Sequence, residues 1–171
     1  PCIVVGIPNS PDRMKELNLF TSQGKAYAEF VVKEVKPFVE SRFNVSSHRH
    51  DNAIMGSSMG GLMSLQMLLA YSDVFALAGC LSSAFQQTAG KIFTQIRKAA
   101  KMPLDSRIYL DTGEFEPPIA ESFFEMVELL KAKGYEEDKN LLGFFDAEAT
   151  HSEAAWARRL HIPLKFLLGK N

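Results

Sequence analysis

The segment Gly56-Ser57-Ser58-Met59-Gly60 places Ser58 between two glycines at the spacing G-x-S-x-G. An apolar strand-like run precedes it and an apolar helix-like run follows it, which is the context in which this motif holds a nucleophilic serine on a sharp turn. We expect side chains two residues before and two residues after Ser58 to collide with neighbouring backbone, which explains both glycines. The alternative is a glycine-rich turn that packs closely or holds a phosphate, but the spacing matches neither common phosphate-binding pattern. The motif therefore predicts that Ser58 is a nucleophile.

A serine hydroxyl attacks a carbonyl only when a base takes its proton. Of the four histidines, His151 follows the last predicted strand, so it should lie at the same end of the sheet as Ser58. His48 and His50 stand in a polar stretch typical of a surface loop, and His161 lies within a predicted helix. The alternative role for His151 is a packed or helix-capping histidine. Given the serine motif, we predict that His151 is the base.

The acid that would orient the histidine has several candidates. The segment RIYLDTG, followed by EFE, carries Asp111, Glu114 and Glu116 close together, and each obeys the chain order serine, acid, histidine. Asp111 lies further back in the predicted strand, where the sheet could engage its side chain. Glu116 precedes Pro117 at a predicted helix start, where a purely structural role is also plausible. From the residues alone, the choice of acid stays open.

Short apolar runs alternate with amphipathic or apolar helical patterns along the chain. The predicted strands cover residues 2–8, 52–57, 74–82, 107–113 and 140–147. The predicted helices cover residues 25–42 with a kink at Pro37, 59–71, one segment between 83 and 104, a segment that starts at Pro117 and ends at Gly134, and 152–168. This alternation predicts one α/β domain over residues 1–171, with a mostly parallel sheet covered by helices on both faces. In such a sheet, function gathers beyond the carboxyl ends of the strands.

The composition is that of an ordinary globular protein. The chain has 171 residues, 46% hydrophobic and 23% charged, with a formal net charge of −1. That charge offers no basic surface for nucleic acid, and no run approaches the roughly 18 apolar residues that would cross a membrane. Cys2 and Cys80 stand in apolar runs, so we expect two buried free thiols rather than a disulfide or a metal site. Because the chain opens with Pro1, we expect the native N-terminus to be absent, and the lack of a signal peptide says nothing about export.

Four segments together resemble the putative esterase family of α/β-hydrolases, which includes esterase D, enterochelin esterases, feruloyl and acetylxylan esterases, and mycolyltransferases. The segments are IVVGIPNSPDRMKEL, AIMGSSMGGLMSLQMLLAYSDVFALAGCLSSAF, YLDTGEFE and HSEAAWARRL. The serine segment and the segment from His151 to Trp156 are the most diagnostic. The resemblance implies an α/β-hydrolase fold. In this family the acid commonly stands three residues after the glycine at the strand end, which ranks Glu116 before Asp111.

The resemblance also implies an incomplete fold. Members of the family begin with further strands, one of which carries the loop that supplies a second N–H to the oxyanion. Met59 N–H, from the residue after the nucleophile, would be the first donor. We therefore expect either a missing N-terminal segment or another subunit of a homo-oligomer to complete the sheet.

The function predicted from these residues is hydrolysis of small carboxylic esters through an acyl-serine intermediate, without a metal or another cofactor. The segment SSAFQQTAGKIF after the third predicted strand is the natural wall of the substrate pocket. Ser83, Phe85 and Gln86 are its candidate substrate contacts, although packing is the alternative role for Phe85. Two other functions remain open: an acyltransferase that uses the same residues, and a non-catalytic binding protein with this fold.

Overall fold

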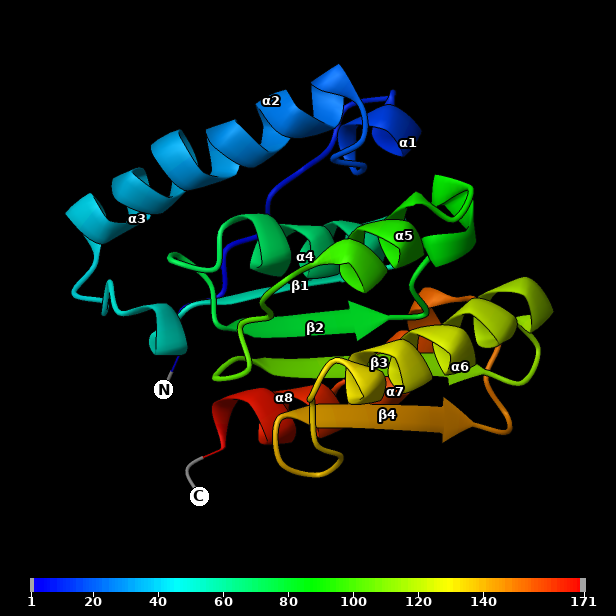
Figure 1. Ribbon diagram of the computed structural model, residues 1–171. Helices are drawn as coiled ribbons and strands as arrows, with labels where there is room; N and C mark the ends of the chain where they lie inside the picture. Colours follow the sequence, from blue (N-terminus) through cyan, green and yellow to red (C-terminus); the bar gives the residue numbers. More distant parts are fainter. Residues whose placement is uncertain (1, 170–171) are drawn as a thin grey trace.

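A computed structural model describes residues 2–169 and contains a four-stranded parallel sheet (Figure 1). The strands are β1 (Ala53–Ser57), β2 (Leu77–Leu81), β3 (Arg107–Gly113) and β4 (Leu141–Asp146). They lie in the order β1-β2-β3-β4, and each neighbouring pair is parallel. All four carboxyl ends consequently meet at one edge of the sheet, on the right-hand side of Figure 1.

Helices cover both faces of the sheet, as predicted (Figure 1). One face carries α4 (Met59–Ala70), α5 (Lys91–Lys98) and α6 (Pro117–Ala132), and the opposite face carries α7 (Glu153–Arg159) and α8 (His161–Leu168). Side chains alternate along β2 accordingly: Ala78 and Cys80 join the larger hydrophobic core, while Leu77 and Leu81 join the smaller core beneath α8. The parallel strands are apolar on both sides because both faces are covered.

The predicted helix over residues 25–42 is longer and less regular than expected. It starts with α2 (Ser22–Phe30), where the Thr21 hydroxyl accepts a hydrogen bond from Gly24 N–H, and ends with α3 (Lys36–Arg42). Between them lies a π-helical turn, η1 (Val31–Val35). Pro37 has no N–H, and its ring crowds the preceding turn of the helix. The π-helical turn η1 is wider than an α-helical turn and gives room for this ring. It lies at the place where a kink was predicted. A short helix, α1 (Arg13–Glu16), and two short 3₁₀ helices, η2 (Arg49–Asp51) and η3 (Phe85–Thr88), complete the elements.

The strand predicted over residues 2–8 was wrong. This segment pairs with no strand of the described residues, and Ile3 and Val4 are 48% and 84% exposed. β-Branched residues favour an extended backbone, but a strand also needs hydrogen bonds to a neighbouring strand. The predicted burial of Cys2 was wrong for the same reason, since Cys2 is exposed. Cys80 is buried as predicted, and its burial raises the pKa of the thiol.

Candidate active site

Ser58 occupies the turn between β1 and α4, with backbone angles φ 58° and ψ −119°. A positive φ is uncommon for any residue except glycine and costs roughly 1–3 kcal/mol, so the surrounding structure must hold it. Two backbone hydrogen bonds do so: Ser58 N–H donates to Leu81 O at 2.8 Å, and Ser58 O accepts from Ala84 N–H at 3.1 Å. The turn is thus fixed to the carboxyl end of β2.

The glycines around Ser58 differ in how much room their surroundings would leave for a side chain. A Cβ at Gly56 would lie 2.7 Å from the Gly60 carbonyl carbon, so the predicted collision two residues before Ser58 is confirmed. A Cβ at Gly60 would meet nothing within 4 Å, so the collision predicted there was wrong. The third glycine, Gly61, is the crowded one, because a Cβ there would lie 2.3 Å from Ser83 Oγ and 3.0 Å from Leu81 O. Close approach of α4 to β1 therefore depends on Gly56, and close packing of α4 on the end of β2 depends on Gly61.

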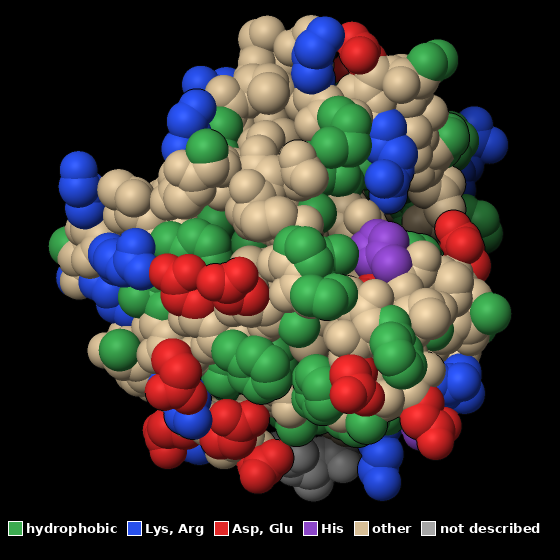
Figure 2. All heavy atoms as spheres, turned by 90° about the vertical axis from the view of Figure 1, so that its right-hand side faces the viewer, with side chains coloured by type: hydrophobic (Ala, Val, Ile, Leu, Met, Phe, Trp, Pro, Cys, Tyr) green, Lys and Arg blue, Asp and Glu red, His purple; other side chains and the backbone are tan. Residues whose placement is uncertain are grey.

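His151 lies in the loop between β4 and α7 and reaches Ser58 from a distance of 93 residues along the chain. Its Nε2 lies 2.9 Å from Ser58 Oγ, and its Nδ1 lies 2.6 Å from Glu116 Oε1. The imidazole and the Trp156 ring pack edge to face, with ring centroids 4.9 Å apart and an interplanar angle of 88°. The imidazole is 37% exposed, and the face at the carboxyl ends of the strands shows exposed imidazole atoms among hydrophobic side chains (Figure 2).

Glu116 is the residue directly before α6, and its side chain is fully buried. One carboxylate oxygen, Oε1, faces His151, while the other, Oε2, accepts hydrogen bonds from Gly113 N–H at 2.5 Å and Ser82 Oγ at 2.9 Å. Ser58, Glu116 and His151, which follow one another in this order along the sequence, are therefore joined in space by hydrogen bonds that run from Ser58 to His151 and from His151 to Glu116.

Asp111, the other candidate acid, is bound elsewhere. Its two oxygens accept from Arg159 Nε and Nη2, both at 2.9 Å, and it also accepts from Tyr109 OH at 2.9 Å and from Ser82 N–H at 2.8 Å. Burial by itself would lower the pKa of Arg159, but the hydrogen bonds and charge of Asp111 outweigh it and raise that pKa. Burial and the neighbouring Asp111 raise the pKa of Tyr109, so its hydroxyl stays protonated and donates. Among the described residues, His151 is hydrogen-bonded to Glu116 and not to Asp111.

Met59 is buried and is the first residue of α4. The first N–H groups of a helix have no partner within the helix, and the Ser58 side chain makes no capping hydrogen bond to them. The N-terminus of α4 therefore presents unpaired donors directly beside Ser58. No group of three or more His, Cys, Asp or Glu residues that could hold a metal ion occurs within residues 2–169. Within the same residues, no helix is long and apolar enough to span a membrane.

The three candidate substrate contacts are placed differently from one another. Ser83 is 2% exposed, and its hydroxyl is buried without a hydrogen-bond partner in the described structure. Phe85 is 1% exposed and packs edge-on against Phe93 in the larger core. Gln86 is half-buried and lines an open hollow of about 240 Å³ between η3, α5 and α6, together with Phe93 and Pro118. Of the three, only Gln86 offers surface to a ligand, and none of Ser58, Glu116 and His151 lines the hollow beside it.

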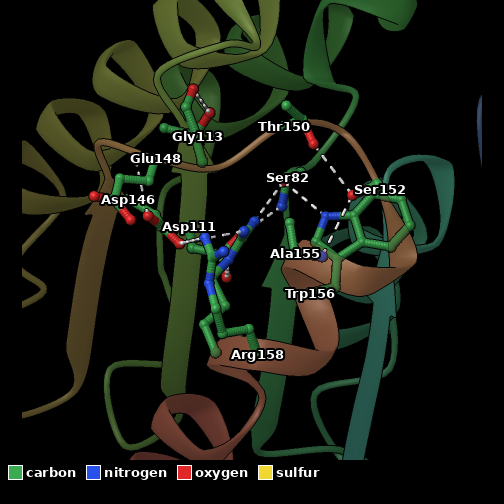
Figure 3. Close-up of polar contacts among 12 residues, drawn as sticks. Ser82, Asp111, Gly113, Asp146, Glu148, Thr150, Ser152, Ala155, Trp156 and Arg158 are labelled. Atoms are coloured by element: carbon green, nitrogen blue, oxygen red, sulfur yellow. Dashed lines mark hydrogen bonds and ion pairs between the residues drawn. The ribbon is translucent and has the colours of Figure 1, made fainter.

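Two further residues at this edge, Trp156 and Arg159, were not predicted from the sequence as parts of the site, and Ser82 was predicted only as the first residue of the pocket wall. Figure 3 shows Ser82 and Trp156. Trp156 Nε1 and Arg159 Nη2 both donate to Ser82 Oγ, which in turn contacts Glu116. One signal was available, because Trp156 and Arg159 are three residues apart in a helix and so share a face directed at the sheet.

The chain resembles known proteins along nearly its whole length. The family model described as "Putative esterase" matches residues 2–167. The uncharacterized protein YbbA of Bacillus subtilis (strain 168) is 24% identical over 161 residues, which covers 89% of this chain and 63% of that protein. The enterobactin esterase FES of Shigella flexneri superposes with a TM-score of 0.80 at 19% identity, covering 93% of this chain and 41% of FES.

A ferulic acid esterase superposes with a TM-score of 0.70 at 18% identity, covering 82% of this chain and 60% of the esterase. At such identities the likeness shows the fold alone, which is the α/β-hydrolase fold. The chain spans less than two thirds of the length of each of these relatives. Because the family model matches all but a few terminal residues, the chain belongs to the Putative esterase family.

Proposed function

We propose that this chain carries the catalytic centre of a serine esterase that hydrolyses carboxylic esters. The observation that carries the proposal is the position of His151, whose imidazole bridges Ser58 Oγ at 2.9 Å and Glu116 Oε1 at 2.6 Å. Membership in an esterase family and the fold of the solved esterases support the same reaction. Ser58 is the nucleophile, His151 the general base and acid, and Glu116 the acid that orients the imidazole.

In the first step, His151 Nε2 takes the proton of Ser58 as Oγ attacks the ester carbonyl. The resulting imidazolium donates from Nδ1 to Glu116, whose negative charge stabilises it. Met59 N–H, at the start of α4, donates to the oxyanion that forms on the carbonyl oxygen. A second oxyanion donor is expected from outside these 171 residues, either from a preceding segment or from another subunit.

In the second step, His151 gives its proton to the leaving alcohol as the carbon–oxygen bond breaks, and the acyl group stays on Ser58. A water molecule then loses a proton to Nε2 and attacks the acyl carbonyl, which releases the carboxylic acid and restores the Ser58 hydroxyl. Each proton that leaves a nucleophile thus returns to a leaving group. The cycle uses only side chains of this chain, backbone donors and water.

The proposed substrate is a small-molecule ester, in line with relatives that are described as enterobactin esterase and ferulic acid esterase. Gln86, at the rim of the hollow beside the start of α6, is the proposed polar contact to the substrate. Ser83 and Phe85 would support this wall from behind, because both are buried.

Replacement of the nucleophile tests the proposal. We expect Ser58→Ala to lower kcat for p-nitrophenyl esters by roughly 10⁴-fold or more, since it removes the acyl-accepting oxygen. Ser57→Ala, which removes the neighbouring hydroxyl, should keep the activity and is the matched control. A fluorophosphonate probe should label the wild type and Ser57→Ala but not Ser58→Ala, and thermal unfolding should show that all three are folded.

Hydrolysis by Ser58→Ala at the wild-type rate would remove Ser58 from the mechanism. A wild-type chain that neither hydrolyses esters nor takes up the probe would instead favour a non-catalytic role for this fold. The probe is informative because it reacts readily only with an activated serine.

A further inference from the structure

Ser82 lies directly after β2, is completely buried, and has a φ of 40°. It lies at the centre of a group of polar side chains drawn from β3, α7 and the loop before α6 (Figure 3). A buried serine in the left-handed region is strained, and such a conformation persists only where the surroundings fix it. The hydrogen bonds that surround Ser82 determine the direction of its hydroxyl proton.

The direction of the Ser82 hydroxyl proton follows from its partners. A hydroxyl has one proton to donate and two lone pairs that accept. Trp156 Nε1 lies 2.9 Å and Arg159 Nη2 lies 2.7 Å from Ser82 Oγ, and both groups can only donate. They occupy the two acceptor positions, so the single proton of Ser82 must go to Glu116 Oε2 at 2.9 Å.

This direction constrains Glu116 in turn. Its Oε2 receives the Ser82 proton, the Gly113 N–H and, at 3.4 Å, the Thr112 hydroxyl, so that oxygen can only accept. The other oxygen, Oε1, faces His151 Nδ1 at 2.6 Å, and an ionised carboxylate oxygen can only accept, so this contact favours the proton on Nδ1. With the proton on Nδ1, the lone pair of Nε2 points to the Ser58 hydroxyl, as a general base requires.

We propose that Ser82 is a positioning residue for the reaction, and that Arg159 and Trp156 direct its proton so that His151 is held in the Nδ1–H tautomer. The kinetic part of this inference rests on the proposed function, whereas the tautomer does not. Arg159 is itself fixed by two hydrogen bonds to Asp111, so the buried Asp111–Arg159 pair serves the site through Ser82. The hydrogen bonds run continuously from Asp111 through Arg159, Ser82, Glu116 and His151 to Ser58.

The test removes the Ser82 hydroxyl in two ways. Ser82→Ala deletes it with the least change of volume, and Ser82→Gly deletes it while suiting the positive φ, which favours a folded variant. The matched control is Ser106→Ala. Ser106 is also completely buried and its hydroxyl also accepts from an arginine, Arg49 Nη2 at 2.9 Å, but it lies before β3 at the opposite end of the sheet.

The first readout needs no substrate. Nitrogen-15 NMR of the free protein should show His151 as the Nδ1–H tautomer in the wild type and in Ser106→Ala. Both Ser82 variants should show a measurable fraction of the Nε2–H tautomer, because Oε2 has lost the donor that links Glu116 to Arg159 and Trp156 and keeps only Gly113 N–H and the more distant Thr112 hydroxyl. An unchanged tautomer in both Ser82 variants would overturn the proposal, whatever the kinetics show.

The second readout is the division between kcat and KM. We expect kcat to fall about 10- to 100-fold in both Ser82 variants, the size of a lost hydrogen bond to a charged group, with KM within about twofold of the wild type. A kcat equal to that of Ser106→Ala would overturn the proposal. Failure of the proposed function would look different: either Ser58→Ala would retain hydrolysis, or the wild type would neither hydrolyse esters nor take up the probe, while the tautomer measurement remained valid.

Discussion

Glu116 and Asp111 are buried carboxylates at the carboxyl end of the same strand, yet their neighbours give them different tasks. Asp111 is paired with a full positive charge, since Arg159 contacts both of its oxygens. Glu116 is contacted by two hydroxyls, a backbone N–H and an imidazole, none of which carries a permanent charge. In the proposed reaction, the charge of Glu116 would therefore be available to an imidazolium that exists only during turnover, which is the role an orienting acid requires.

Replacement of Glu116 and Asp111 by the corresponding amides should separate an effect on catalysis from an effect on stability. We expect Glu116→Gln to lower kcat by about 10⁴-fold, because an amide cannot stabilise the imidazolium and favours the wrong tautomer. Asp111→Asn should lower the free energy of unfolding by about 3 kcal/mol, because it leaves the Arg159 guanidinium buried without its counter-charge. Steady-state kinetics and urea unfolding of both variants measure the two effects. A larger loss of kcat in Asp111→Asn than in Glu116→Gln would reverse the assignment of the acid.

At the scale of elements, the turn from β1 into α4 determines where Ser58 is presented. The start of α4 lies so close to the end of β2 that a Cβ at Gly61 would meet Ser83 Oγ and Leu81 O. Gly60, although it belongs to the G-x-S-x-G motif, faces open space. The motif therefore marks the turn correctly, while the closest packing is made by the next residue along the helix.

Alanine substitutions at Gly60 and Gly61 should therefore have different effects on the free energy of unfolding. We expect Gly61→Ala to lower the free energy of unfolding by about 1–3 kcal/mol through overpacking. Gly60→Ala should be neutral or stabilising by up to about 1 kcal/mol, because alanine favours a helix over glycine. Urea unfolding curves with equal slopes would allow the midpoints to be compared directly. Equal losses in both variants would mean that α4 moves to relieve the contact at Gly61.

Much of the element order follows from local patterns in the sequence. The predicted strand 107–113 and the helices after Ser58 and Glu116 agree with β3, α4 and α6 because each is apolar, well bounded and packed as its pattern requires. The segment 2–8 also has a β-branched pattern but finds no partner strand within residues 2–169, and no local pattern reports the absence of a partner. Pairing is a property of two segments, so it was not predictable from one.

The candidate site likewise contains residues that local sequence patterns reveal and a residue whose role depends on contacts in the folded chain. Ser58 carries a motif, and the rule that parallel strands end together placed His151 at the same edge. The same rule left the acid open among Asp111, Glu114 and Glu116, and only the family resemblance ranked Glu116 first. Ser82 carries no motif. Its importance depends on a positive φ and on donors from α7, 74 and 77 residues away in sequence, which meet only in the folded chain. Such a convergence has no signature in sequence spacing.

For the whole molecule, the main feature is the outer edge of the sheet. β1 pairs with β2 on one side, and no strand within residues 2–169 pairs with its other side. Ala53 and Met55 of β1 are exposed, as are Ile3 and Val4 of the extended N-terminal segment. An edge with unpaired N–H and C=O groups beside apolar side chains is a template for further strand pairing.

We therefore expect the 171-residue chain to self-associate through this edge. Sedimentation velocity should show the average mass rising with protein concentration for the wild type. Ala53→Lys, which places a charge on the edge, should shift this rise to higher concentration, since charged side chains discourage pairing at strand edges. Ala100→Lys adds the same charge at an exposed position after α5 and should behave as the wild type does. A monomeric wild type at all concentrations, or equal behaviour of the two lysine variants, would show that the outer edge of β1 does not drive association.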